Sequence, residues 1–234
     1  MVRWALAGQR PFGRGGGIRA KALALVIDRA PHEPTLADPQ MLAERIEALA
    51  SPHMTSLNAY VEAMRTRRGD VPFFDPFDGG AHARMLLLLE TPGRSSAPVR
   101  FTSLDNPTGA ARNLRRLFAC AGIGRKETAI WNAVPWVLQS EGKKLRAPRK
   151  SEIENAGDEL STLLRYLPSL NVVVLAGRVA GRMEEVVRSS MPAAHILRCP
   201  HPSPTFVNTS PAVVQQLKET FARAASLISG SART

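Results

Sequence analysis

The sequence predicts an α/β fold: a three-layer α/β/α sandwich with a central four-stranded parallel sheet. Four short apolar segments alternate with longer stretches in which apolar residues recur at helical spacing. Because these segments are apolar at nearly every position, both faces of each strand should be buried, as in parallel sheets covered by helices. The predicted strands are Met85–Glu90, Thr128–Val134, Asn171–Ala176 and Ala194–Arg198.

Two helices are predicted before the first strand. Asp38 and Pro39 have the residue types of a helix cap and first turn, so a helix should run from there to Ala50. Its apolar face would be formed by Leu42, Ile46 and Leu49. A second helix should cover Ser56–Arg65, and Pro72–Gly80 is typical of a turn-rich connection.

Four further helices are expected after the first strand. Gly109–Ala121 has apolar residues on one face and arginines largely on the other. Ser151–Tyr166 opens with the spacing of a capping box, from Ser151 to Glu154. Another helix should cover Gly177–Ser190, and the last should begin at Ser210.

The composition is that of a globular protein. The chain has 234 residues, of which 44% are hydrophobic and 22% are charged, and these values exclude a globally disordered or low-complexity chain. Apolar runs such as Met85–Leu89 and Val172–Ala176 have the length of strands, whereas a transmembrane helix needs about 20 apolar residues. We therefore expect that the protein does not enter a membrane. We also expect it to be a monomer.

The charge balance indicates a polyanionic partner. The chain has 31 Lys and Arg against 20 Asp and Glu, a formal net charge of +11. Such an excess fits nucleic acid, although a basic surface can also serve only to keep a protein soluble. We assign residues 1–34 to a basic, glycine-rich arm that contacts phosphates or, alternatively, acts as a transit peptide. Residues 35–234 are assigned to a single domain.

The cysteine count limits the cofactors that the chain could bind. Cys120 and Cys199 are too few for a disulfide framework, a four-thiolate zinc site or an iron–sulfur site with four cysteine ligands. The simplest interpretation is a reduced, cytoplasmic compartment and no cofactor. His195, Cys199 and His201 are close enough in sequence to suggest a three-ligand zinc site as an alternative.

The strand ends indicate where a ligand should bind. In open parallel sheets, ligands lie beyond the carboxyl ends of the strands. This rule selects four segments as the candidate site: Glu90–Ser96, Trp131–Trp136, Gly177–Arg178 and Cys199–Phe206.

Three residue patterns in these segments are suited to holding a ligand. Pro92–Gly93 predicts a sharp turn that permits close approach of the backbone to a ligand. Asn132 follows apolar strand residues, and its amide needs partners if it is buried. His201 lies between Pro200 and Pro202, which restrict its backbone and suit a preorganised hydrogen-bond donor.

These segments, in this order, resemble the motifs of the uracil-DNA glycosylase superfamily. LETPG (from Leu89) resembles the first motif, WNAVPW (from Trp131) the middle motif and HPSP (from His201) the last. DNPTGAARNL (from Asp105) resembles a helix start found in several members. The resemblance covers residues 84 to 227. With two cysteines, the chain looks like a divergent branch without an iron–sulfur cluster.

The resemblance implies a role for each motif. Asn132 would recognise uracil, and His201 would stabilise the departing base. Thr91 stands where the best-known members have an aspartate, whereas Glu90 matches the glutamate of bacterial families with the motif Gly-Glu-Ala-Pro-Gly. Glu90 is thus the candidate carboxylate near the sugar or the water, with the Thr91 hydroxyl as second choice. Alternatively, Glu90 only accepts backbone N–H groups and caps the loop.

The remaining candidates would surround the base and the DNA. Phe101, after the first motif, would stack on the base, unless it is ordinary core. Residues assigned to the substrate-binding turn are Pro92, Gly93 and Arg94. Residues assigned to DNA contact are Ser203, Phe206, Lys143, Lys144 and Arg146, with Phe206 as a wedge in the space left by the base.

The sequence therefore predicts a DNA repair glycosylase. It would flip uracil out of DNA, hydrolyse its N-glycosidic bond and leave an abasic site. The alternative is a module on the same fold that binds damaged or abasic DNA with little turnover. A hydrolase of the α/β type or a nucleotide-binding protein is disfavoured, because the chain has neither a GxSxG elbow nor a GxxxxGK[ST] loop.

Overall fold

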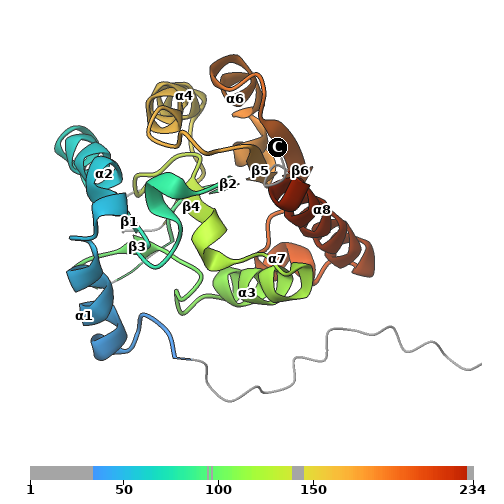
Figure 1. Cartoon of the computed structure of the whole chain (residues 1–234), viewed down its shortest axis with the longest axis horizontal. Helices are drawn as coiled ribbons and strands as arrows, with labels where there is room; N and C mark the ends of the chain where they lie inside the picture. Colours follow the sequence, from blue (N-terminus) through green and yellow to red (C-terminus); the bar gives the residue numbers. More distant parts are fainter. Residues whose placement is uncertain (1–33, 94, 96, 139–144, 231–234) are drawn as a thin grey trace, which may run out of the picture. The chain divides into compact units, whose positions relative to one another are not determined.

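A four-stranded parallel sheet lies at the centre of the fold, with the strands in the spatial order β4-β2-β5-β6 (Figure 1). A smaller parallel pair, β1 and β3, lies beside it. The strands are β1 (Phe73–Phe74), β2 (Met85–Leu89), β3 (Phe101–Thr102), β4 (Thr128–Asn132), β5 (Val172–Ala176) and β6 (His195–Cys199). The predicted four-stranded parallel sheet is confirmed.

The helices connect these strands in chain order. The α-helices are α1 (Pro39–Ala48), α2 (Thr55–Arg68), α3 (Gly109–Ala121), α4 (Lys150–Leu164), α5 (Arg178–Gly181), α6 (Glu184–Ser190), α7 (Pro204–Val207) and α8 (Pro211–Gly230). Three short 3₁₀ turns cover Pro52–Met54, Gly80–His82 and Arg125–Glu127. None of the helices in the described part of the chain is long and apolar enough to cross a membrane.

The computed structural model describes residues 34–93, 95, 97–138 and 145–230. Nearly all of the predicted arm, together with Arg94, Lys143 and Lys144, lies outside these residues. The described residues belong to one compact unit.

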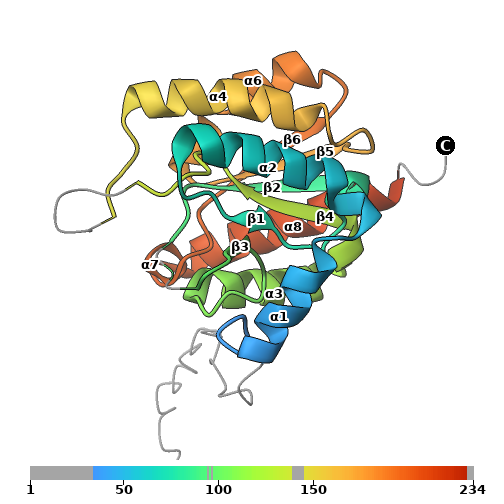
Figure 2. The ribbon, with the colours of Figure 1, turned by 90° about the vertical axis from the view of Figure 1, so that its left-hand side faces the viewer.

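The strand side chains alternate between two hydrophobic cores. Along β2, Leu86 and Leu88 belong to one core, and Met85 and Leu87 belong to the other. The first core includes side chains of α2, α4 and α6, and the second includes those of α3 and α8. Figure 2 shows the two helix layers on opposite sides of the sheet. This is the predicted α/β/α sandwich, and it forms because the two central strands, β2 and β5, are apolar at every position, whereas the edge strand β6 is partly exposed.

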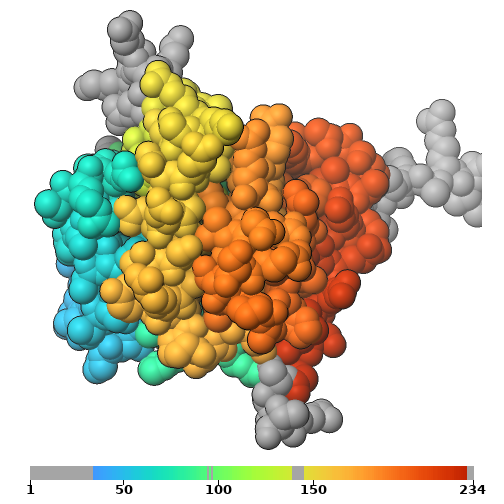
Figure 3. All heavy atoms as spheres, turned by 90° about the horizontal axis from the view of Figure 1, so that it is seen from above, coloured from blue at the N-terminus to red at the C-terminus, as the bar shows by residue number. Residues whose placement is uncertain are grey.

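Helices α4 and α6 lie side by side on one face (Figure 3). Gly157 permits this approach, because a Cβ atom there would lie 3.2 Å from Val186 Cγ2. The hydroxyls of Ser161 and Ser190 are 3.2 Å apart and link the same two helices.

Three local predictions differ from the structure. Phe73 and Phe74 are a strand paired with Phe101 and Thr102, not part of a loop. In α4, the Glu152 carboxylate accepts the Arg149 N–H at 2.7 Å, so the capping residues are not Ser151 and Glu154. The predicted helix Gly177–Ser190 is two helices, α5 and α6, separated after Gly181.

Helix α1 buries a charge beside part of the predicted apolar stripe, since Leu42 and Leu49 pack against the first core as expected. Ile46, expected on the apolar face, is 39% exposed, whereas Arg45 is 2% exposed. The Asp38 cap is as expected, since its carboxylate accepts the Gln40 N–H at 2.8 Å.

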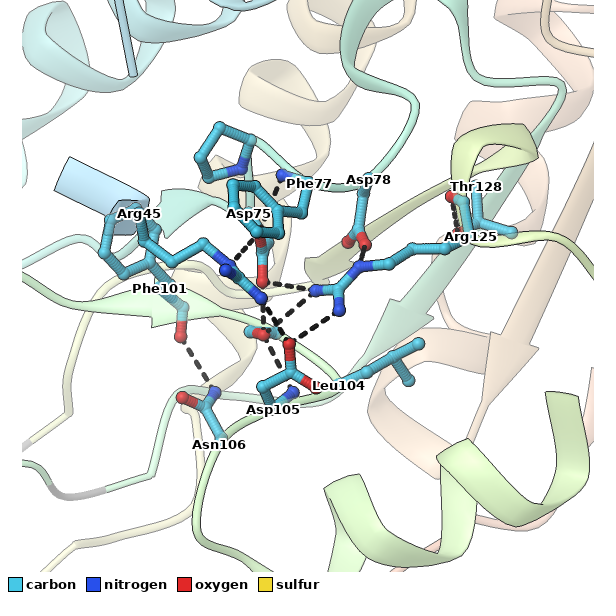
Figure 4. Close-up of polar contacts among 12 residues, drawn as sticks. Arg45, Asp75, Phe77, Asp78, Phe101, Leu104, Asp105, Asn106, Arg125 and Thr128 are labelled. Atoms are coloured by element: carbon cyan, nitrogen blue, oxygen red, sulfur yellow. Dashed lines mark hydrogen bonds and ion pairs between the residues drawn. The ribbon is translucent and has the colours of Figure 1, made fainter. Parts of the chain in front are cut away.

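Arg45 belongs to a buried ion cluster that joins four distant segments (Figure 4). Its guanidinium contacts Asp75 at 2.9 Å and Asp105 at 2.5 Å, and it lies 3.4 Å from the centroid of the Phe77 ring. Arg125 contacts Asp75, Asp78 and Asp105 at 2.5–2.6 Å. The cluster therefore ties α1, the loop after β1, the loop after β3 and the turn before β4 to one another.

The carboxyls of the cluster differ in their electrostatic surroundings, and Arg115 Nη1 also lies 3.9 Å from Asp105 Oδ1. Burial and the nearby charge of Asp75 raise the pKa of Asp78 well above its ordinary value. Burial acts in the same direction on Asp105, but Arg125 outweighs it and holds the pKa of Asp105 below its ordinary value.

We expect Arg45→Met to destabilise the fold strongly. The substitution keeps the volume but leaves buried carboxylates without their partner, and breaking a buried pair in this way costs about 3–5 kcal/mol. The control is Arg188→Met, which removes an exposed ion pair with Glu184 and should change stability by less than about 1 kcal/mol. Urea unfolding measures both, and equal effects of the two substitutions would contradict a structural role of the cluster.

Candidate active site

The register of the sheet brings the predicted site segments to one edge. Leu89 pairs with Asn132, and Ala176 pairs with Cys199. The backbone hydrogen bonds continue past the strands, from Ala133 N–H to Leu89 C=O and from Gly177 N–H to Cys199 C=O. The first residues after β2 and β6 and the last residue of β4 therefore face the same side of the molecule.

Glu90 is held against the start of helix α5. Its Oε1 atom accepts a hydrogen bond from the Val179 N–H at 3.0 Å. Gly177, with φ of +98°, makes room for it, because a Cβ atom at this position would lie 2.7 Å from Glu90 Oε1. One carboxylate oxygen thus caps the backbone, as the alternative interpretation of Glu90 proposed.

Asn132 is buried at the end of β4, with 4% of its surface exposed. Its Nδ2 atom donates a hydrogen bond to Thr102 Oγ1 at 3.2 Å. The preceding residue, Trp131, stacks on Phe74 with 3.8 Å between the ring centroids. The amide is therefore rigidly placed at the edge of the sheet.

His201 presents one ring nitrogen as a donor. Its Nδ1 atom accepts a hydrogen bond from the Ser203 N–H at 3.2 Å, so in the neutral ring the proton resides on Nε2. Burial lowers the pKa of His201 below its ordinary value, although the negative charge of Glu90 acts in the opposite direction. At neutral pH the ring is thus an uncharged Nε2–H donor.

Helix α3 supports the loop that carries His201. Asn113 Nδ2 donates to the Pro202 carbonyl at 2.8 Å. Gly109, one helical turn earlier, packs on Pro204 so closely that a Cβ atom would lie 2.3 Å from Pro204 Cγ. The resemblance of residues 105–114 to a family helix start therefore has a physical basis, since this helix face holds the histidine loop.

The first-motif turn is anchored by an arginine. Arg100 donates to the Gly93 carbonyl and to the Asp70 carboxylate. Thr91 is half-buried, Pro92 is buried and Gly93 is exposed. Apart from its chain neighbours, no described residue has an atom within 4 Å of where a Cβ atom at Gly93 would lie.

The two candidate aromatic residues differ in exposure. Phe101 lies in β3 with 5% of its surface exposed, and its ring is 6.3 Å from that of Phe73. Phe206, in α7, is 47% exposed, and its ring centroid lies 6.3 Å from that of His201. The exposed ring beside the histidine is compatible with the predicted wedge, and the stacking role of Phe101 stays a prediction.

Of the basic residues predicted to bind phosphate, Arg146 lies within the described residues. It makes two contacts with Glu152, at 2.8 and 2.5 Å. The same carboxylate caps α4, so Arg146 helps to hold the start of that helix, and its contact with DNA stays a prediction.

The zinc alternative is contradicted by strand geometry. His195 and Cys199 are the first and last residues of β6, which places them about 13 Å apart at 3.3 Å per residue. One ion cannot reach both. The described residues contain no group of three potential metal ligands.

Sequence reasoning missed three residues that support the site: Thr102, Asn113 and Arg100. Each makes a hydrogen bond to a motif residue from another element. For Asn113 the signal was present in its spacing of four from Gly109, which places both residues on one helix face.

The fold and this edge define an α/β/α domain that presents an amide, an imidazole and a carboxylate where its parallel strands end. The sequence model of the uracil DNA glycosylase superfamily matches residues 76–224, well over half of the chain. The chain therefore belongs to the uracil DNA glycosylase superfamily, as its motifs predicted.

Similar solved structures include glycosylases from two sources. Wild-type SMUG2 of Pedobacter heparinus is 12% identical, with a TM-score of 0.45 and coverage of 77% of this chain and 85% of that one. A variant of mimivirus UNG in complex with UGI is 12% identical, with a TM-score of 0.36 and coverage of 73% and 72%. No similar sequence was found among curated proteins.

We expect NMR of ring-labelled protein to show the Nε2–H form of His201 at neutral pH. Its titration midpoint should lie below the ordinary value of 6.5, because burial disfavours the imidazolium. Glu90→Gln should lower the midpoint further, since it removes the charge that favours the imidazolium. A midpoint above 6.5, or a proton on Nδ1, would contradict the tautomer inferred from the Ser203 contact.

Proposed function

We propose that this protein hydrolyses the N-glycosidic bond of uracil in DNA and leaves an abasic site. Water oxygen bonds to C1′ of the sugar as the bond from C1′ to uracil N1 breaks. The electron pair of that bond departs with the base, and its charge spreads to O2. The proton lost by water is finally balanced by protonation of the released base.

The observation that carries this proposal is the state of His201. A neutral ring whose Nδ1 is occupied by the Ser203 N–H has its Nε2–H available for an anion. Charge on uracil O2 grows in the transition state, and a preorganised donor stabilises such charge without reorganisation. Half-burial of the ring strengthens the interaction, because the effective dielectric constant is lower than in water.

Asn132 supports the choice of uracil as the base. A side-chain amide can accept from N3–H and donate to O4 of uracil at the same time. The buried position of Asn132 makes an incorrect match costly, since an unpaired buried polar group costs about 1–3 kcal/mol. The base must leave the DNA stack to reach this edge, so base flipping is part of the proposal.

The hydrogen bonding of the Glu90 carboxylate favours a second candidate function. Its Oε1 atom accepts the Val179 N–H, so part of the carboxylate is used to hold the backbone, and Thr91 offers no second carboxylate. A protein with this arrangement could bind damaged or abasic DNA with little turnover. The intact pair of Asn132 and His201 favours the hydrolase, and an assay of base release separates the two functions.

We predict that the purified protein releases uracil from a uracil-containing oligonucleotide, and that EDTA does not prevent this. Asn132→Ala should reduce release strongly, because the amide contacts that select uracil are lost. Asn132→Asp should also weaken release and permit some release of cytosine, because the changed edge can match the N4 amine. Binding of the DNA without release of base would instead favour the low-turnover module.

We predict that His201→Ala lowers the single-turnover rate by roughly 10²–10³-fold, the usual loss for one preorganised donor. DNA affinity should hardly change, because phosphate contacts dominate binding. Glu90→Gln should also slow the reaction if the charge assists the sugar cation or the water.

Melting temperature, measured on the same variants, separates chemistry from structure. If Glu90→Gln leaves the rate unchanged but lowers the melting temperature, the role of Glu90 is only structural, through its hydrogen bond with the Val179 N–H. The control is Glu62→Gln on α2, where the side chain is 60% exposed and neither quantity should change.

A further inference from the structure

One peptide unit of the histidine loop (His201–Pro204) is held at both of its ends. The Ser203 N–H donates to His201 Nδ1 at 3.2 Å, and the Pro202 carbonyl accepts from Asn113 Nδ2 at 2.8 Å. The peptide bond between Pro202 and Ser203 is trans, so its N–H and C=O groups point in opposite directions within one plane. The two hydrogen bonds therefore act on opposite sides of the same rigid unit.

The direction of both hydrogen bonds is fixed by the chemistry of the backbone groups. A backbone N–H can only donate, and a carbonyl oxygen can only accept. The ring nitrogen that faces Ser203 must therefore be the unprotonated one, and the amide of Asn113 must turn its NH₂ group toward Pro202.

The prolines of the loop do not set the orientation of this peptide unit. Their rings fix φ of Pro202 and Pro204, and Ser203, which precedes a proline, has an extended ψ of 151°. The unit rotates through two other dihedrals, ψ of Pro202 and φ of Ser203, which the rings leave unrestricted. The hydrogen bond from Asn113 acts directly on this rotation.

The orientation of the unit determines which nitrogen of His201 carries the proton. As placed, the Ser203 N–H needs an acceptor at Nδ1, so the proton of the neutral ring is on Nε2. Rotation of the unit turns this N–H away and brings the Pro202 carbonyl toward the ring, where it favours Nδ1–H. A partial rotation already weakens the bond, because hydrogen bonds lose strength steeply as their angle falls.

We propose that Asn113 is a positioning residue, which fixes the Pro202–Ser203 peptide unit and thereby keeps the proton of His201 on Nε2. The catalytic consequence rests on the proposed function, in which the Nε2–H group stabilises the departing base. In the other tautomer Nε2 is an acceptor and cannot donate to an anion.

Helix α3 gives Asn113 a position that does not depend on the histidine loop. The Thr108 hydroxyl caps the helix by accepting the Ala111 N–H at 3.2 Å. Leu114, the neighbour of Asn113, is 2% exposed and belongs to the second core. The amide is thus presented from a rigid helix.

The test measures the tautomer of His201 by nitrogen NMR of the ring-labelled protein, above the titration midpoint and without DNA. The signals of this ring are assigned by their absence in His201→Ala. Asn113→Leu keeps most of the volume but cannot donate. We expect the ratio of the Nε2–H form to the Nδ1–H form to fall roughly fivefold, the usual effect of one lost hydrogen bond. Asn113→Ala, which adds no bulk, should shift the ratio in the same direction.

The second measurement is the single-turnover release of uracil by the same variants. Only molecules with the Nε2–H form can donate to the departing base, so the rate should fall by up to the same factor. DNA affinity should not change, because phosphate contacts dominate binding.

The matched control is Asn58→Leu on α2. Asn58 Nδ2 also donates to the backbone carbonyl of another segment, that of Leu49, at 2.7 Å. This variant reports the general cost of removing such a contact, which melting temperatures of all variants measure. Its tautomer ratio at His201 and its rate should equal those of the wild type.

The outcomes separate this inference from the proposed function. If both Asn113 variants keep the wild-type tautomer ratio, the inference is overturned, and a lower melting temperature then shows a structural role only. An equal shift of the ratio in Asn58→Leu also overturns it. If the ratio shifts as expected but the wild type releases no uracil, the proposed function fails, whereas the control of the tautomer by Asn113 stands.

Discussion

The parallel pairing of β2 with its two neighbours is the constraint on which the rest of the structure depends. β2 is hydrogen-bonded to β4 on one side and to β5 on the other. Its side chains alternate between two cores, so a shift of one residue would exchange the residues that face each core. The same register places Glu90, Asn132 and His201 at one edge, and the site is therefore a consequence of how the core is packed.

The groups at that edge take their orientation from elements outside the sheet. Helix α5 holds Glu90 through a backbone N–H, strand β3 holds Asn132 through a hydroxyl, and helix α3 holds the loop of His201 through an amide. Each support is a single hydrogen bond to a different part of the chain. The orientation of these groups is thus fixed by their surroundings before any ligand binds.

Much of this architecture follows from local sequence. The exceptions depend on partners distant in sequence, or belong to strands too short to show a pattern. Apolar runs such as Met85–Leu89 predict buried strands because they leave no polar face, and α3 has the predicted bounds. In helix α1 the burial of Arg45 could not be predicted locally, since the carboxylates that it contacts lie 30 and 60 positions away. β1 and β3 have two residues each, too few to show a period. For the candidate site, the strand-end rule selected Asn132, Glu90 and His201, which lie at one edge of the sheet, whereas Thr102 carries no local signal because its partner is distant in sequence.

The buried ion cluster also has a consequence for how the chain folds. Arg45 and Asp105 are 60 positions apart, and Arg125 reaches back 50 positions to Asp75. Such contacts become favourable only after long loops have closed, and they lose their solvation before their partners are all in place. We therefore expect the cluster to close late, after the sheet and its helices have collapsed, and to affect the unfolding rate more than the folding rate.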